Sequence, residues 1–317
     1  MEDIVLELKN VNHWFGSGAK QNNVLYDLNL KIRAGQIVSL IGPSGCGKSV
    51  LLRAIVGTHP PREGHIIVHA SDNVQSAIMK HKPGRDVGIV YQQYSLFPFL
   101  TAVQNVAFGL MLDQTNIPFR AFRPFKWRHL RKQHLAEAAT LLERLKLKNA
   151  IHKYPSEMSG GMCQRVAIAQ ALIMKPMILL LDEPFGALDE ATRTELQDML
   201  LTLYAENNQT IQAGQRPPYT IIIVTHELNE AIRVGDRVIG LSMNWNWRKD
   251  HAIYPGTTIV YDKRAPIFLP EQEIDYAMLK KQKEEISHAV FDASFQQDRD
   301  EFRQFWSENK TGRSQDA

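Results

Sequence analysis

The sequence predicts an α/β fold with a mainly parallel β-sheet, and two observations carry this prediction. Three continuous apolar runs, at residues 37–41, 177–181 and 220–225, have the length and character of strands covered on both faces of a sheet. A glycine-rich segment, residues 42–49, joins the first run to a helix-like stretch at residues 50–56. Because strands that alternate with helices pair in parallel, these runs are expected to share one sheet.

The other strands follow from alternation and from turn residues. Residues 4–9 and 24–32 are expected to be strands, and the stretch between them, residues 13–23, is expected to be a turn. Residues 65–69 and 88–92 are expected to be two further short strands.

In residues 101–151, apolar residues recur at helical spacing, which predicts that this stretch is helical. Leu196, Met199, Leu200 and Leu203 share one helical face, as in a helix that covers a sheet. The polar segment 205–219, which contains glycine and two prolines, is expected to be a surface loop.

Composition narrows the class of protein. The 317 residues are 44% hydrophobic and 22% charged, which is ordinary for a globular chain, and the net charge of +3 is too small to argue for nucleic acid. Two cysteines exclude a disulfide scaffold and suit a reducing compartment. No apolar run approaches bilayer length, and the acidic N-terminus is expected to be a strand, not a signal peptide, so the protein is expected in the cytosol.

Residues 42–49, GPSGCGKS, fit the phosphate-binding pattern G-x-x-x-x-G-K-[ST] in its strand–loop–helix context. Backbone N–H groups of such a loop form an anion nest at a helix N-terminus. Lys48 is predicted to contact the β and γ phosphates, and the Ser49 hydroxyl to bind Mg²⁺. A glycine-rich turn without a ligand would give the lysine and the serine no role, so a nucleoside triphosphate site is predicted.

Cys46 lies inside this loop, where Lys48 and the helix N-terminus could lower the pKa of its thiol. The sequence favours the simpler interpretation, in which a small residue is tolerated in the loop.

Two carboxylates, Asp182 and Glu183, follow a buried apolar strand. An acid at this position is expensive to bury unless it has a function. Asp182 is predicted to hold Mg²⁺ and Glu183 to act as general base toward the attacking water. The alternative, an acid pair that only caps the next helix, is disfavoured by the phosphate loop upstream.

Residues 158–165, MSGGMCQR, form a second candidate anion nest at a helix start. One chain does not need two nests for one triphosphate. The second nest is therefore predicted to close on a nucleotide held by another copy.

In this order, the motifs resemble those of the nucleotide-binding subunit of ATP-binding cassette (ABC) transporters, over roughly residues 4–241. The resemblance implies a P-loop NTPase core with a mainly parallel sheet, an antiparallel β subdomain and an α-helical subdomain at about residues 95–170. Residues 242–317 would form a helical C-terminal extension with charged amphipathic helices, one carrying Ile286, Ala289, Val290 and Ala293 and another Phe302, Phe305 and Trp306.

The resemblance also assigns site residues, matched motif by motif. Phe15, with Trp14 as second choice, would stack on adenine, Gln92 would sense the metal and the transporter, and His226 would contact the γ-phosphate. The expected catalytic residues are Glu183, His226 and Gln92, and the expected Mg²⁺ ligands are Ser49, Gln92 and Asp182. The expected ATP-binding residues are Phe15, Gly42, Ser44, Gly45, Cys46, Gly47, Lys48, Ser49, Val50, Ser159, Gly160, Gly161 and Asp189.

Three positions depart from the family pattern. Met158 and Met162 replace leucine and glutamine in the signature motif, and Glu227 replaces the aspartate after the histidine. None of these changes removes a catalytic group, so a competent ATPase is expected.

The resemblance implies partners as well. Two copies would pair head to tail, each ATP held between the phosphate loop of one and residues 159–161 of the other. Two transmembrane permease subunits and an extracytoplasmic solute-binding protein would complete the system, with this chain peripheral on the cytoplasmic face of the inner membrane and no nucleic acid bound.

Residues 94–110 and 184–200 resemble the importer branch, especially the nitrate/taurine/sulfonate-type ATPases. This predicts import of a small, anionic solute. An ATPase of a lipid- or efflux-type ABC system stays open as the alternative. Soluble ABC proteins of ribosomes or DNA repair usually carry two cassettes or a long coiled coil, and a simple nucleotide kinase would lack the signature motif, so both are weaker.

Residues 116–132 stand apart because six Lys and Arg residues interleave with four aromatic residues. Two interpretations stay open. The insert contacts anionic lipid headgroups or the membrane subunit, or it is a solvated loop whose aromatic residues pack on the helical subdomain.

Overall fold

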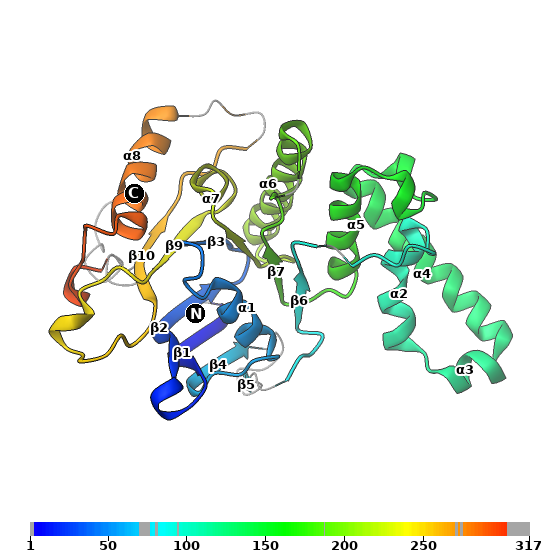
Figure 1. Ribbon diagram of the computed structural model, residues 1–317. Coiled ribbons are helices and arrows are strands. Elements are labelled where there is room, and N and C mark those ends of the chain that lie inside the picture. Colours follow the sequence, from blue (N-terminus) through cyan, green and yellow to red (C-terminus); the bar gives the residue numbers. More distant parts are fainter. Residues whose placement is uncertain are drawn as a thin grey trace.

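The computed structural model describes residues 3–69, 77–79, 82–93, 95–186, 188–269, 272 and 275–302. Figure 1 shows two sheets in the body of the molecule and an arm of helices that extends from one side. The expected residues Phe305 and Trp306 lie outside the described part of the chain, as does Ala187 of the segment before Asp189.

The larger sheet has the strand order β10-β9-β3-β8-β7-β6. Its five parallel strands are β3 (Ile37–Ile41), β6 (Val87–Val90), β7 (Ile178–Asp182), β8 (Ile221–Thr225) and β9 (Arg237–Ser242). Every residue of β3, β8 and β9 is buried. The predicted parallel sheet is confirmed, and the apolar runs are its central strands because helices or other chain segments cover both faces.

The smaller sheet is antiparallel, in the order β2-β1-β4-β5. Its strands are β1 (Ile4–Phe15), β2 (Asn22–Arg33), β4 (Glu63–His69) and β5 (Ala77–Met79). The expected turn at residues 13–23 is too long, because β1 and β2 stay paired as far as Phe15 and Asn22. The two glycines that suggested the turn, Gly16 and Gly18, do lie in the shorter connection between Phe15 and Asn22.

Helix α1 (Lys48–Val56) leads from β3 to β4 of the smaller sheet, whereas α6 (Glu190–Gln212) joins β7 to β8 and α7 (Leu228–Val234) joins β8 to β9. The arm holds α2 (Ala102–Gln114), α3 (Ile117–Phe122), α4 (Pro124–Arg144) and α5 (Gly160–Leu172), and lies beyond the β6 edge (Figure 1). Short 3₁₀ turns occupy Gly18–Lys20, Lys148–Ala150, Pro155–Glu157, Trp247–Lys249 and Arg299–Glu301.

The expected surface loop at residues 205–219 is wrong in its first half, because α6 continues to Gln212. Asn207 explains the difference. Its buried amide donates to the carbonyls of Gly35 and Tyr219 at 2.9 and 2.6 Å and accepts from Tyr219 N–H at 3.1 Å. A polar side chain that looked like a loop signal instead ties the helix to the chain beneath it.

The C-terminal part completes the larger sheet. The expected boundary at residue 241 falls inside β9, and β10 (Thr258–Arg264) pairs with β9 as an antiparallel edge strand. Helix α8 (Tyr276–Ile286) continues into a π-turn, Ser287–Phe291, where Ile286, Ala289 and Val290 are buried. Ala293, expected on the same helical face, is exposed beyond the end of the turn.

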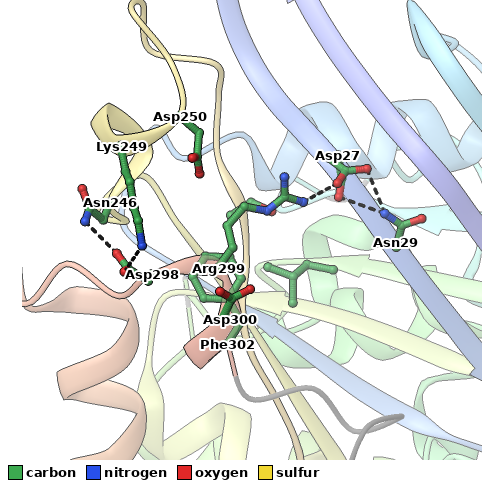
Figure 2. A pocket seen from close by; sticks show the side chains of 11 residues that line it. Asp27, Asn29, Asn246, Lys249, Asp250, Asp298, Arg299, Asp300 and Phe302 are labelled. Atoms are coloured by element: carbon green, nitrogen blue, oxygen red, sulfur yellow. Dashed lines mark hydrogen bonds and ion pairs between the residues drawn. The ribbon is translucent and has the colours of Figure 1, made fainter.

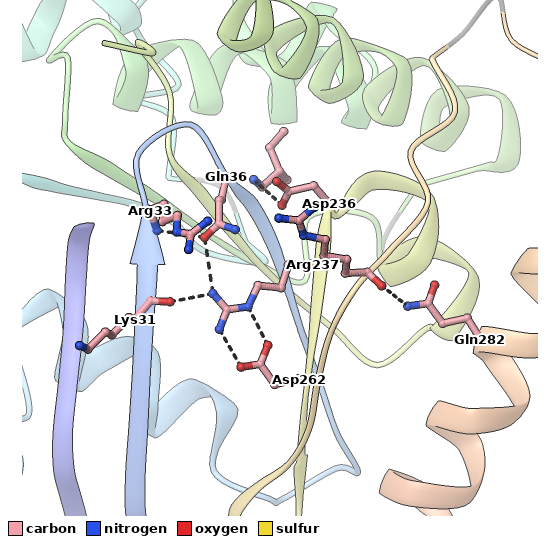
Figure 3. Close-up of polar contacts among 9 residues, drawn as sticks. Lys31, Arg33, Gln36, Asp236, Arg237, Asp262 and Gln282 are labelled. Carbon is pink, nitrogen blue, oxygen red and sulfur yellow. Dashed lines mark hydrogen bonds and ion pairs between the residues drawn. The ribbon is translucent and has the colours of Figure 1, made fainter. Parts of the chain in front are cut away.

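Two polar clusters fasten this region to the N-terminal sheet. In Figure 3, Arg237 forms a two-pronged ion pair with Asp262, both bonds 2.7 Å long, and donates to the Lys31 carbonyl of β2 at 2.7 Å. In Figure 2, Lys249 pairs with Asp298, and Arg299 pairs with Asp27 of β2. The C-terminal segment is therefore part of one folded body.

Candidate nucleotide-binding site

The phosphate loop turns at the end of β3 and leads into α1. Gly45 and Gly47 have φ angles of +80° and +95°, which favour glycine. A Cβ at Gly47 would lie 2.9 Å from side-chain atoms of Val24 and Leu25, so β2 also leaves no room there. The loop conformation thus requires the glycines that the motif predicts.

Lys48 is buried at the start of α1 and bends back over the loop. Its Nζ donates to the carbonyls of Gly42 and Pro43 at 2.6 and 3.0 Å. The ammonium group is therefore held at the mouth of the anion nest, where a phosphate oxygen can replace a carbonyl as its partner.

Cys46 is buried beside this lysine, with Sγ 3.9 Å from Lys48 Nζ. Burial raises the pKa of the Cys46 thiol, and the opposing charge of Lys48 does not reverse the shift. The expected net lowering of this pKa is wrong, because burial outweighs the lowering effect of Lys48. The interpretation of Cys46 as a small loop residue agrees with its surroundings.

A cavity of about 840 Å³ opens over the loop. This volume is within the usual range for small-molecule sites. It brings together residues far apart in the sequence, which are Phe15, Asn22, Val24, Gly42, Pro43, Ser44, Gly45, Gly47, Lys48, Ser49, Val50, Glu183, His226 and Phe291. An aromatic residue, an anion nest, a buried cation and a carboxylate in one cavity fit the parts of a nucleoside triphosphate.

Phe15 is the aromatic residue that the cavity favours over Trp14. Its ring is 40% exposed, at the end of β1, and contacts His13 edge-on at 4.9 Å. Trp14 is half-buried and does not belong to the cavity lining.

Glu183 stands one residue beyond the end of β7 with a φ of +47°. This conformation is unusual for glutamate and is held by a bond from Glu183 N–H to the Val224 carbonyl at 2.9 Å. The carboxylate Oε1 lies 3.4 Å from His226 Nδ1, which follows β8. Adjacent parallel strands thus present the predicted base and the predicted phosphate-contacting histidine at one sheet edge.

Asp182 ends β7, and burial, followed by the neighbouring Glu183, raises the pKa of its carboxyl group. A divalent cation would relieve both effects. In the described residues no cluster of three His, Cys, Asp or Glu side chains could hold a metal alone. Ser49 lines the cavity, whereas Asp182 is outside its lining but close enough to Lys48 for the lysine charge to act on its carboxyl group. Oxygen donors such as these suit a hard cation that takes its remaining ligands from phosphate and water.

Gln92 lies beside Gly186, three residues after Glu183. A Cβ at Gly186 would be 3.5 Å from Gln92 Nε2 and 3.9 Å from Glu183 Oε2. Gln92 is therefore close to the Glu183 carboxylate, although it is not part of the cavity lining.

The signature residues lie elsewhere in this chain, at the start of α5 in the helical arm (Figure 1). Ser159 caps α5 by accepting from Met162 N–H at 3.3 Å. Asp189 caps α6 and accepts from the Thr192 N–H and hydroxyl at 3.0 and 2.7 Å. Ser159, Gly160, Gly161 and Asp189 are all absent from the cavity lining.

Gly161 has a packing role that the motif did not reveal. A Cβ there would come within 1.7 Å of Thr192 Cγ2, so α5 and α6 touch at this residue. Residues 159–161, predicted to act on a nucleotide of another copy, and Asp189, predicted to bind ATP, are thereby joined through Thr192.

The sequence did not point to Phe291, which lines the cavity from the C-terminal part. Its position follows from Val290, whose carbonyl accepts from Ser242 Oγ at 2.9 Å and whose side chain lies over Gly240. Phe291 belongs to no motif. The only indication in the sequence is that Val290 and other apolar residues next to it have helical spacing.

The fold and the cavity define a P-loop nucleotide-binding protein of the cassette type. Residues 25–186 match the family described as ABC transporter, and the chain belongs to this family. Within the described part of the chain, no helix is both long and apolar enough to cross a membrane.

Among curated relatives, the sulfate/thiosulfate import ATP-binding protein CysA of Pectobacterium atrosepticum is 41% identical over 234 residues, which cover 74% of this chain and 62% of the relative. The aliphatic sulfonates import ATP-binding protein SsuB of Bacillus licheniformis is 38% identical over 224 residues, covering 71% and 74%. The chain thus spans less than two thirds of the length of the CysA relative.

A solved structure of similar fold is the ATP-binding cassette MJ0796, a dimer in a post-hydrolysis state bound to ADP and Pi. The TM-score is 0.59 at 29% identity, with 83% of this chain and all of that chain covered. The resemblance to the family and the predicted fold class are confirmed.

Proposed function

We propose that this chain binds MgATP and hydrolyses it as the motor subunit of an ABC importer for a small anion. The main observation behind the proposal is that Glu183, His226 and the phosphate loop line the same cavity. Family membership supports the same conclusion.

Ser49, Asp182 and Gln92 would hold Mg²⁺. When bound, Mg²⁺ would neutralise charge on the β and γ phosphates. Lys48 would bind the phosphates through Nζ, and loop N–H groups would bind their oxygens. Phe15 would stack on the base.

Glu183 would accept a proton from the attacking water at a carboxylate oxygen. Its position beyond β7 is fixed by the bond to the Val224 carbonyl, so the carboxylate needs little reorganisation. His226 would orient the carboxylate and contact the γ-phosphate.

Two copies would complete each site, because Ser159, Gly160, Gly161 and Asp189 lie outside this chain's own cavity. The dimeric cassette of similar fold supports this arrangement. The chain would work on the cytoplasmic face of the membrane with two permease subunits and a solute-binding protein.

The test is size-exclusion chromatography with Mg·ATP of wild type and Glu183→Gln. We expect a stable dimer of the variant only, because unhydrolysed ATP keeps the interface closed, and ATP turnover lowered by at least about a hundredfold. Lys48→Ala should neither bind ATP nor dimerise. A Glu183→Gln protein that hydrolyses ATP at the wild-type rate would refute the catalytic assignment.

The proposed cargo is a small oxyanion of the sulfate or sulfonate kind, since the relatives import sulfate, thiosulfate and aliphatic sulfonates. Uptake of labelled sulfate and alkanesulfonate in cells with and without the gene tests this. Unchanged uptake of both, with permease subunits copurifying, would favour the lipid- or efflux-type alternative.

A further inference from the structure

The corner between α3 and α4 carries an unusual charge. Between residues 114 and 136 the sequence has six Lys and Arg residues and no Asp or Glu. These six exceed the net charge of the whole chain, which is +3. They are Arg120, Arg123, Lys126, Arg128, Arg131 and Lys132. We call residues 116–132 the basic corner.

The basic corner is not neutralised from within the chain. Among the described residues, none of the six cations takes part in a salt bridge, whereas cations elsewhere, such as Arg165 and Arg144, pair with carboxylates at 2.8 and 2.6 Å. In the described part of the chain, the one hydrogen bond made by these six side chains is from Arg120 Nε to the Asn116 carbonyl. The charges therefore face solvent and attract anions.

The aromatic residues of the basic corner divide into two pairs. Phe119 and Trp127 are half-buried, and Trp127 contacts the buried His134 with ring centroids 6.4 Å apart. His134 in turn bonds Gln114 at 3.0 Å, which links α4 to the end of α2. This pair anchors the corner to the arm, as the packing interpretation expected.

The other pair does not pack. Phe122 and Phe125 are 85% and 84% exposed on either side of the α3–α4 junction, and Ile117 is 75% exposed. Figure 1 shows α3 at the outer end of the arm, away from both sheets. Three large apolar side chains exposed among unpaired cations form a site for contact, not a part of the core.

We propose that the basic corner binds the surface of an anionic phospholipid membrane. The cations contact phosphate headgroups, while Phe122, Phe125 and Ile117 enter the interfacial region. A nucleic acid would satisfy the cations but would leave Ile117 exposed, because an aliphatic side chain offers no ring for base stacking. Membrane binding by the basic corner does not depend on ATP hydrolysis, so the two proposals are tested separately.

The experiment is cosedimentation of the full chain with phosphatidylcholine vesicles, with and without phosphatidylglycerol. We expect binding only when phosphatidylglycerol is present, and weaker binding at higher salt. The variant Phe122→Ser/Phe125→Ser should lower the affinity at least about tenfold, since each ring loses its interfacial contact. Neutralising Arg123, Lys126 and Arg128 to glutamine should abolish the preference for phosphatidylglycerol.

Matched control variants distinguish binding at the basic corner from non-specific binding to vesicles. Ile253→Ser/Tyr276→Ser removes two large apolar side chains that are 77% and 75% exposed. Glutamine at Lys280, Lys281 and Lys283 removes three exposed cations of α8. Both controls should bind vesicles like wild type, and every variant should keep its ATP affinity. Equal loss in the controls, no gain from phosphatidylglycerol, or displacement of the vesicles by single-stranded RNA would overturn the proposal.

Discussion

At the scale of the residue, the C-terminal part reaches the nucleotide cavity through Phe291. The same cavity contains Phe15, which arrives from β1. A base held by one aromatic side chain would thus have a second one within the same enclosure, and aromatic contacts of this kind contribute about 0.5–1.5 kcal/mol each.

We therefore expect Phe291→Ala to weaken ATP binding about fivefold. Isothermal titration with a slowly hydrolysed ATP analogue measures the change. Phe295→Ala is the control, because Phe295 contacts His288 and does not belong to the cavity lining. Equal affinities of Phe291→Ala and wild type would exclude a direct contact.

Asp236 offers a second test at this scale. It precedes β9, its Oδ1 accepts from Ile37 N–H at 3.1 Å, and burial, only partly offset by that bond and by Arg237 and Arg264, raises its pKa to about 7 (Figure 3). The folded state therefore holds a proton that the unfolded state loses near pH 4. Its contribution to the free energy of unfolding is full at low pH and is lost as the pH rises toward 7.

Asp236→Asn mimics the protonated acid and should remove this loss. Relative to wild type, the free energy of unfolding of the variant should rise between pH 5 and pH 8, by about 2–3 kcal/mol. Urea unfolding at both pH values measures it. A difference from wild type that is the same at both pH values would contradict the shifted pKa.

At the scale of the element, α5 and α6 meet at Gly161 and Thr192. The motif suggests that Gly161 is required for phosphate binding. The packing suggests that Gly161 is required because α6 leaves no room for a side chain. Because Thr192 also bonds Asp189, a shift here would disturb both residues 159–161, predicted to act on the nucleotide of a second copy, and the predicted ATP-binding residue Asp189.

Gly161→Ala should therefore lower ATP turnover at least about tenfold while leaving ATP affinity of the monomer unchanged. Adding Thr192→Ser removes the clashing Cγ2 and keeps the hydroxyl for Asp189, so the double variant should recover much of the activity. Steady-state ATPase assays of both variants decide the matter. No recovery in the double variant would mean that Gly161 acts on the nucleotide and not through packing.

At the scale of the whole molecule, the C-terminal part is structural. Ile286, Ala289 and Val290 join a core with Ile41 of β3 and Val238 of β9. The Arg237 guanidinium, fully buried, has its carboxylate partner on β10.

A chain ending at residue 242, close to the boundary that the motifs suggest, should not fold. It would expose that core and leave Arg237 buried without Asp262, a loss of about 3–5 kcal/mol for the ion pair alone. Soluble yield and the circular dichroism of purified protein are the measurements. A soluble, ATP-binding fragment would show that residues beyond 242 are dispensable for the cassette.

The sequence by itself determined the parallel strands, the phosphate loop and the residues at the strand ends. These are local signals, since Asp182 and His226 lie next to continuous apolar runs and Lys48 ends the glycine-rich loop that follows a third run. The parallel sheet then brings the ends of those runs to one edge.

Only the tertiary structure decided the rest. Four features depend on residues far away in the chain. They are the positive φ of Glu183, the need for glycine at residue 161, the helical turns around Asn207 and the position of Phe291 in the cavity lining. The exposure of Phe122 and Phe125 is of the same kind, because whether an aromatic residue packs or projects depends on which neighbours are within reach. Periodicity in the sequence predicts the secondary structure of one segment. The contacts of a side chain depend also on which other segments the fold places next to that segment.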